Sequence, residues 1–169
     1  MKQLRLFPLH TGIWEGTYTR INAAGDKTNQ WKSRLTIKLT DDGAYHQVNQ
    51  YFWPDGHAEC HDFGVCYFDE SGMLIFNNPR IEGYSWETKD SVCLIWTYKN
   101  RPGSKLFEMI DLIGDGTHRV RNWRWTENDE FQGITMIEER RVATQEQIEP
   151  QFWINLPNLR TTGPSRSDH

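Results

Sequence analysis

Apolar and polar residues alternate along most of this chain, in short runs that are separated by turn residues. The clearest stretch is Lys105–Val142, which holds three alternating runs with turn signals at Gly114–Gly116 and Glu127–Glu130. Asp-Gly between two alternating runs is among the strongest short-range signals for a β-hairpin. The stretch therefore predicts three consecutive antiparallel strands.

The register of these strands follows from the turns. With Asp115 and Gly116 as the central turn residues, the opposed pairs are Ile113 with His118, Ile110 with Arg121, Glu108 with Trp123, and Leu106 with Trp125. If the second loop closes on Thr126 and Phe131, the opposed pairs are Trp123 with Ile134, Arg121 with Met136, and Arg119 with Glu138. One face then mixes large aromatic side chains with charges of both signs. A closed barrel with a ligand cavity explains such a face better than a flat sandwich does, because a barrel interior can hold charges that are paired or that contact a ligand.

The rest of the chain repeats this pattern. Turn signals at 22–26, 41–43, 54–56, 70–72, 89–90 and 101–103 divide it into further short alternating runs, which gives about ten strands in all. This spacing is typical of all-β proteins. We predict an all-β fold, an antiparallel up-and-down barrel of eight to ten strands.

The whole chain, 1–169, is predicted to be a single barrel domain, with the barrel at about 11–143 and a C-terminal extension at 144–169. Residues 4–9 are expected to cap one barrel end, and 143–148 to form a short helix or turn. Residues 152–156 are expected to pack on the barrel, and the last residues to be disordered.

Composition narrows the function classes. The chain has 169 residues and a net charge of −4, so it lacks the basic footprint of a nucleic-acid-binding protein. A mean hydropathy of −0.75 argues against a membrane span. The start lacks the long apolar stretch of a secretory signal, and three cysteines without a CxxC motif do not form a disulfide framework. We therefore expect a cytoplasmic protein.

The mixed face of the 105–142 stretch holds the best site candidates. Its arginines can contact a ligand carboxylate within an aromatic pocket, and its glutamates can hold the arginines in place or move protons. Cross-strand ion pairs packed by tryptophan explain the same residues equally well. Arg121 is the stronger candidate, because it faces the uncharged Met136, whereas Arg119 faces Glu138. The predicted ligand-binding residues are Gln50, Trp96, Glu108, Arg121, Trp123, Trp125, Met136 and Glu138.

Two further segments carry candidate site residues. The run from Tyr45 to Trp53 carries amides on both faces, so one amide group is expected to point into the barrel, unless the run is an edge strand with a wet face. His57 and His61 lie four residues apart, which suits a metal on a helix, but on a strand such residues are about 13 Å apart. We therefore predict no metal site and no cofactor. Haem ligation by His46, His57 or His61 ranks below metal binding as an alternative.

Two resemblances refine the fold. Gly12-x-Trp14 near the start, with Arg140 or Arg141 late in the chain, resembles the signature of lipocalin-like (calycin) barrels, in which the Trp closes one barrel end beneath the Arg. The resemblance implies a lipocalin or fatty-acid-binding-protein-like barrel. The segments HTGIWEGTYTRI, SRLTIKL, YHQVNQYFWPDG, HDFG, WTYK, FEMIDL and RVRNWRW resemble a cyanobacterial domain-of-unknown-function family with a calycin barrel that is structurally akin to phycobilin lyases. No lyase motif maps onto this chain residue by residue.

The sequence thus favours a lipocalin-like protein that binds a hydrophobic, anionic or conjugated small molecule, such as a pigment, a tetrapyrrole, an isoprenoid or a fatty-acid-like compound. The first alternative is an enzyme on the same fold, an isomerase, cyclase or chromophore lyase. It would act by confinement and by acid/base chemistry from Glu15, Glu108 or Asp111. The second is an interaction module whose exposed aromatics dock another protein. A homodimer is left open.

Overall fold

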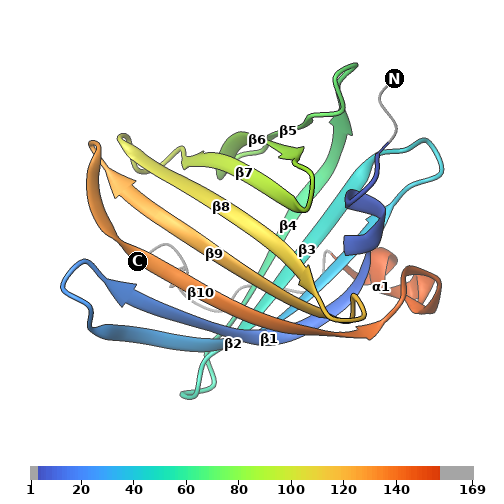
Figure 1. The fold of residues 1–169 in the computed structure, drawn as a ribbon. Coiled ribbons are helices and arrows are strands. Elements are labelled where there is room, and N and C mark those ends of the chain that lie inside the picture. The colour runs from blue at the N-terminus through green and yellow to red at the C-terminus, as the bar shows by residue number, and fades with distance from the viewer. Residues whose placement is uncertain (1–3, 157–169) are drawn as a thin grey trace.

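The fold is a closed antiparallel β-barrel of ten strands (Figure 1). The structure is a computed structural model that describes residues 4–156. The strands are β1 (Gly12–Asn22), β2 (Lys27–Leu39), β3 (Tyr45–Phe52), β4 (Ala58–Phe68), β5 (Leu74–Asn77), β6 (Ile81–Glu87), β7 (Ser91–Tyr98), β8 (Ser104–Ile113), β9 (His118–Glu127) and β10 (Glu130–Ala143). The helical elements are η1 (Phe7–His10), η2 (Gln145–Gln147) and α1 (Pro150–Asn155). The predicted fold class is confirmed, at the upper end of the predicted strand number.

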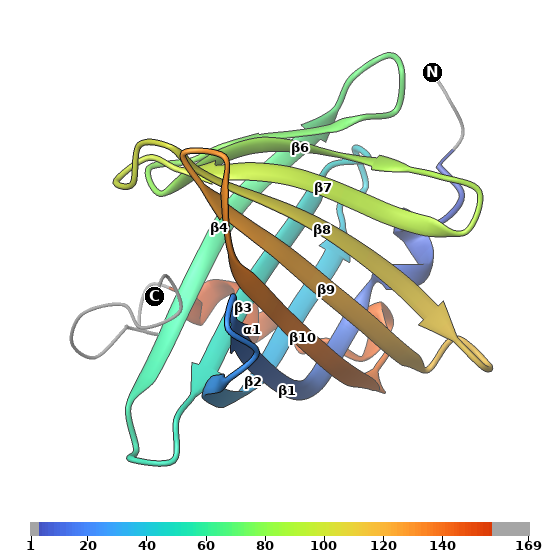
Figure 2. The same ribbon diagram turned by 60° about the vertical axis from the view of Figure 1, so that its left-hand side comes forward.

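Each strand pairs with the next one along the chain, and β1 pairs with β10 to close the barrel (Figure 2). The ladder between β4 and β5 is the shortest, with only the pairs Tyr67–Ile75 and Phe68–Leu74. Every predicted alternating run corresponds to a strand, because each turn signal lies where the chain reverses.

The segment before β1 covers one end of the barrel, as the sequence predicts. Phe7 of η1 is buried and packs edge-on against the rings of Tyr45 and Phe68. The Glu87 carboxylate at the end of β6 accepts hydrogen bonds from the backbone N–H groups of residues 5–7, which fixes the segment in place.

Helix α1 lies after the barrel. Its Trp153 ring contacts His46 of β3, with ring centroids 4.7 Å apart, and lies under the Lys38 ammonium of β2. The expected turn at 143–148 is the one-turn helix η2. The expectation of a disordered chain end falls on residues 157–169, which lie outside the described residues.

The barrel interior is aromatic. Trp14, Tyr18 and Trp31 are almost completely buried, and Tyr18 stacks on Trp31 with ring centroids 5.2 Å apart. These rings fill the β1–β3 side of the barrel. Side chains from strands β3 to β9 leave space unfilled and enclose the cavity described below.

The predicted register is correct for β8 and β9 and shifts by one residue between β9 and β10. All four predicted β8–β9 pairs occur. Phe131 faces Thr126 as predicted, but Gly133 then faces Trp125, which leaves Gln132 as the extra residue of a β-bulge. Gly133 has a φ of +142°, a backbone conformation that favours glycine.

This shift corrects the inward face of β10. Because side chains alternate along a strand, a one-residue slip exchanges its two faces. Thr135, Ile137 and Glu139 point inward, whereas Met136 and Glu138 point outward. The predicted placement of Met136 and Glu138 in the cavity wall was therefore wrong.

Candidate functional site

A cavity of about 100 Å³ lies inside the barrel, between η1 and strands β3–β9. Most of its wall is apolar, with Trp96 and Trp123 set edge to face at a centroid distance of 5.3 Å. A cavity of this size holds several water molecules or a small organic molecule. Four of the predicted binding residues line it, namely Trp96, Glu108, Arg121 and Trp123.

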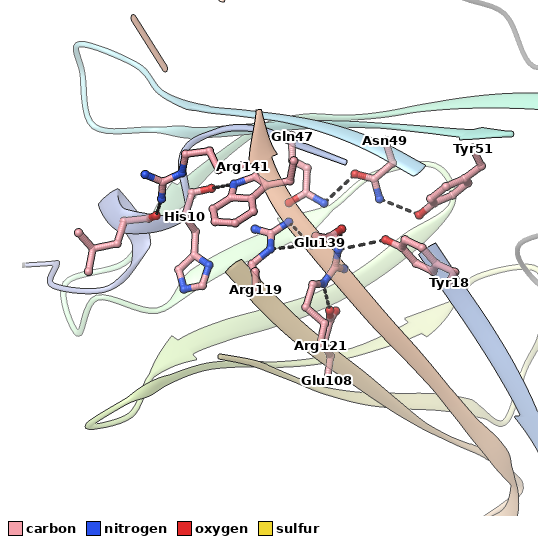
Figure 3. Close-up of polar contacts among 12 residues, drawn as sticks. His10, Tyr18, Gln47, Asn49, Tyr51, Glu108, Arg119, Arg121, Glu139 and Arg141 are labelled. Carbon is pink, nitrogen blue, oxygen red and sulfur yellow. Dashed lines mark hydrogen bonds and ion pairs between the residues drawn. The ribbon is translucent and has the colours of Figure 1, made fainter. Parts of the chain in front are cut away.

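At the cavity wall, two arginines and two glutamates form a continuous chain of ion pairs (Figure 3). Arg121 donates from Nε to Glu108 Oε1 over 2.5 Å, and from Nη1 to Glu139 Oε1 over 3.1 Å and to the Tyr18 hydroxyl over 3.0 Å. Arg119 donates from Nε to Glu139 Oε2 over 2.6 Å. Both arginines are thus paired with carboxylates, which is the ion-pair alternative recognised in the sequence.

The partners differ from those predicted because of the bulge at Gly133. Arg119 faces Glu139 rather than Glu138, and Arg121 faces Ile137 rather than Met136. As predicted, no carboxylate directly faces Arg121 on β10. Its charge is instead matched by two diagonal neighbours, Glu108 and Glu139. Burial alone would lower the pKa of the Arg121 guanidinium, but Glu108, Tyr18 and Glu139 raise that pKa well above its ordinary value. Arg121 therefore stays charged.

Trp14 closes the barrel end beside this network. Its ring is fully buried, and the guanidinium carbons of Arg119 and Arg141 lie 4.3 and 4.7 Å from its centroid. Its indole Nε1 donates to the His10 carbonyl over 2.9 Å. The predicted Trp–Arg contact is confirmed for Arg141, which lies directly opposite Trp14 on β10.

A ladder of polar side chains runs along β3 on the cavity wall (Figure 3). The Tyr45 hydroxyl donates to Gln47, the Gln47 amide to Asn49, and the Asn49 amide to the Tyr51 hydroxyl, over 2.8–2.9 Å. Sequence reasoning expected an amide to point into the barrel here but chose Gln50. Gln50 lies on the opposite face of β3, one residue out of phase with this ladder, so that choice was wrong.

The other predicted residues lie outside the cavity. Trp125 is half-buried between the guanidiniums of Arg20 and Arg101, whose carbons lie 4.2 and 4.7 Å from its ring centroid. Of the three candidate catalytic carboxylates, Glu15 pairs with Arg34 on the outer surface and Asp111 accepts from Ser91, while only Glu108 lines the cavity.

Apart from Arg119, whose guanidinium is ion-paired with Glu139, three residues of the cavity wall carry buried polar atoms without a hydrogen-bond partner among residues 4–156. These atoms are His10 Nδ1, Ser85 Oγ and Trp123 Nε1. Burial, reinforced by Arg119, Arg121 and Arg141, lowers the pKa of His10 to about 2, so its imidazole is neutral. Sequence reasoning missed His10 and Ser85. His10 opens the segment HTGIWEGTYTRI, but neither residue belongs to a binding motif, and only the fold brings η1 and β6 to the same cavity.

His57 lies just before β4, and His61 lies within it. His57 and His61 both contact the buried carboxylate of Glu59, at 3.2 and 2.7 Å. Within the described part of the chain, no group of three or more His, Cys, Asp or Glu side chains can hold a metal ion. No helix among residues 4–156 is both long and apolar enough to cross a membrane.

Comparison with known proteins places the chain in a family. Residues 1–144 match the model described as domain of unknown function (DUF3598), N-terminal. The chain belongs to the DUF3598 family. The cyanobacterial family resemblance seen in the sequence is thereby confirmed, while the kinship with phycobilin lyases stays a prediction. No curated protein matches the chain.

Two solved structures share this fold. One is a DUF3598-family protein of unknown function from Nostoc punctiforme PCC 73102, which is 18% identical with a TM-score of 0.64 over 83% of this chain and 51% of that protein. The other is Rv2717c from M. tuberculosis, 15% identical with a TM-score of 0.55 over 79% of this chain and 92% of that protein. The DUF3598 chain described here thus spans about half the length of its Nostoc relative.

Proposed function

We propose that this DUF3598 barrel binds a small, largely apolar molecule in its internal cavity. The observation that carries the proposal is the cavity itself, whose wall is mostly apolar and includes buried polar atoms that lack a partner among residues 4–156. Binding sites for small molecules have this composition, with a few placed polar groups in an apolar wall. A planar, conjugated ligand suits the wall best, because Trp96 and Trp123 offer aromatic surface.

An anionic ligand, as the sequence also favoured, has less support. Arg119 and Arg121 are both held by carboxylates. A ligand carboxylate would have to compete with Glu108 and Glu139 for these guanidiniums.

The proposal is tested with 1-aminoanthracene, an uncharged fluorescent probe that brightens in apolar surroundings. We expect saturable binding to the wild type. Leu94→Trp should abolish it by filling the cavity, since Leu94 is part of the wall. The matched control is Met136→Trp, which adds an indole on the outer surface. Equal probe binding by both variants would place the probe outside the barrel and contradict the proposal.

The enzyme alternative rests on Glu108, the one carboxylate in the cavity wall among the described residues. A carboxylate there can exchange a proton with a confined ligand. If the protein turns over a ligand that co-purifies with it, Glu108→Gln should stop turnover while leaving the ligand bound. Mass spectrometry of material extracted from the purified protein supplies the compound for this assay.

The cysteines and the outer wall of the barrel bear on the location and the assembly of the protein. A reducing, cytoplasmic compartment is consistent with three free cysteines. A homodimer can form through the outer wall, where Tyr84 and Phe107 are exposed. Light scattering on the purified protein decides between monomer and dimer.

A further inference from the structure

We propose that the cavity selects an uncharged ligand that presents a hydrogen-bond acceptor, such as the carbonyl of an aromatic ketone, aldehyde or amide. This inference rests on the proposed binding function and names the chemical class of the ligand. It is carried by Ser85, Trp123 and His10, three residues of the wall that are 1%, 6% and 4% exposed. Each has a polar atom without a partner among residues 4–156.

The chemistry of these three atoms points to an acceptor. An indole N–H donates only, and a serine hydroxyl donates or accepts. The imidazole of His10 is neutral, so its Nδ1 either donates or accepts according to the tautomer. All three atoms can therefore donate a hydrogen bond, and the indole nitrogen of Trp123 can do nothing else, so the group they have in common is an acceptor on the ligand. A buried donor without a partner destabilises the ligand-free protein. A ligand oxygen that accepts from such a donor forms a hydrogen bond and also removes that destabilisation, and both effects favour binding.

Strand register places two of the donors at one level of the barrel. Ser85 faces Leu94, Leu94 faces Glu108, and Glu108 faces Trp123. Three strand spacings, about 14 Å along the curved wall, separate Ser85 from Trp123. Between these two donors the wall consists of Leu94 and of the Glu108 carboxylate, which Arg121 holds, so a flat ligand at this level has a donor at either edge.

The charges of the wall explain why the ligand should be neutral. The positive charges of Arg119 and Arg121 are matched by the carboxylates of Glu139 and Glu108. A third guanidinium, that of Arg80, lies over the Tyr98 ring at 5.5 Å. A neutral carbonyl can accept from one of the three donors without disturbing any of these pairs, whereas a carboxylate brings an additional negative charge beside two buried glutamates.

The test is a matched series of three probes with one apolar body: naphthalene, 2-acetonaphthone and 2-naphthoate. Affinities are measured by quenching of tryptophan fluorescence at pH 7.5. We expect the ketone to bind about tenfold more tightly than naphthalene, on the scale of one satisfied hydrogen bond. We expect 2-naphthoate to bind less tightly than the ketone.

Variants assign the effect to individual donors. The ratio of ketone to naphthalene affinity should fall toward one in Ser85→Ala or in Trp123→Phe, whichever removes the donor that the single carbonyl contacts, with folding checked by circular dichroism. A wild-type ratio in both variants would overturn the assignment to these two donors. The control is Ser91→Ala, a serine that bonds Asp111 outside the cavity, and it should keep the wild-type ratio.

The outcomes separate the two proposals. Equal affinities for ketone and naphthalene would overturn the acceptor inference while leaving the cavity a binding site. Tightest binding of 2-naphthoate, lost in Arg80→Gln, would overturn it in favour of an anionic ligand. If none of the three probes binds, the proposed function fails as well.

Discussion

Arg121 and Glu108 form a buried ion pair between neighbouring strands, with the guanidinium Nε 2.5 Å from the carboxylate Oε1. The two residues are diagonal neighbours, because Arg121 faces Ile110 and Glu108 faces Trp123. Arg121 also contacts Glu139 of β10, and Glu139 in turn contacts Arg119, which lies two residues before Arg121 on β9. The network is therefore a unit in which each charge depends on the others.

Removing one member should destabilise the protein strongly. Arg121→Met leaves Glu108 without its guanidinium and Glu139 with only Arg119, and should lower the free energy of unfolding by about 3–5 kcal/mol. Arg121→Lys keeps the charge but loses the planar, multiple contacts, and should cost about 1–3 kcal/mol. Urea unfolding measures both.

The control for this comparison is Arg124→Lys, at an exposed position three residues along β9. It should change the free energy of unfolding by no more than about 0.5 kcal/mol. If Arg121→Met unfolds at the wild-type urea concentration, the network does not stabilise the fold, and the buried arrangement of Figure 3 is wrong.

Trp14 is expected to be a structural residue. Trp14→Ala removes a fully buried ring that contacts two guanidiniums, and should cost about 3–5 kcal/mol in the free energy of unfolding. Trp86→Ala is the matched control, because Trp86 is only half-buried, and it should cost clearly less. A Trp14→Ala variant as stable as the wild type would show that the barrel end is closed by other contacts.

Part of the site could be predicted from the sequence, because it depends on the register of two neighbouring strands. The Asp115-Gly116 turn gave the β8–β9 register and so placed Glu108, Arg121 and Trp123 in one wall. Turn chemistry is local, and a short loop fixes the register of the two strands beside it.

The features that could not be predicted depend on contacts between segments that are far apart in the sequence. The bulge at Gly133 exchanges the faces of β10, and nothing in the alternation of 131–142 distinguishes the two registers. Likewise, the choice between the two amide faces of β3 depends on which face the closed barrel turns inward. His10 reaches the cavity only because η1 folds across the barrel end. These features require the closed barrel.

The buried, neutral His10 predicts a dependence of stability on pH. Its pKa is lowered from 6.5 to about 2 in the folded protein. Between these values the unfolded chain binds a proton that the folded protein does not bind, so the free energy of unfolding falls as the pH falls below 6.5. At pH 4.5 this contribution amounts to about 2–3 kcal/mol.

His10→Gln isolates the effect from that of other acidic groups. Urea unfolding of wild type and variant is compared from pH 7.5 to pH 4.5. The stability of the wild type relative to the variant should decrease by about 2–3 kcal/mol across this range. Parallel pH curves would mean that His10 protonates freely in the folded protein.

The cysteines should be poorly reactive thiols. Burial, together with the negative charge of Asp62, raises the pKa of Cys60 to about 11, and burial also raises the pKa of Cys66 and Cys93. Only the thiolate attacks a disulfide reagent, so a raised pKa lowers the rate at neutral pH. In a Cys66→Ala/Cys93→Ala variant, Cys60 should react with a disulfide reagent at pH 7.5 about two orders of magnitude more slowly than free cysteine.

Two further measurements separate charge from access in this slow reaction. If the raised pKa is the cause, the rate for Cys60 should keep rising with pH well beyond 8.5, where the rate for an ordinary thiol levels off. Adding Asp62→Asn removes the neighbouring negative charge, lowers the pKa of Cys60 and should raise the rate severalfold at pH 7.5. A rate that levels off near pH 8.5 and does not respond to Asp62→Asn would instead mean that the reagent reaches Cys60 only when β4 opens.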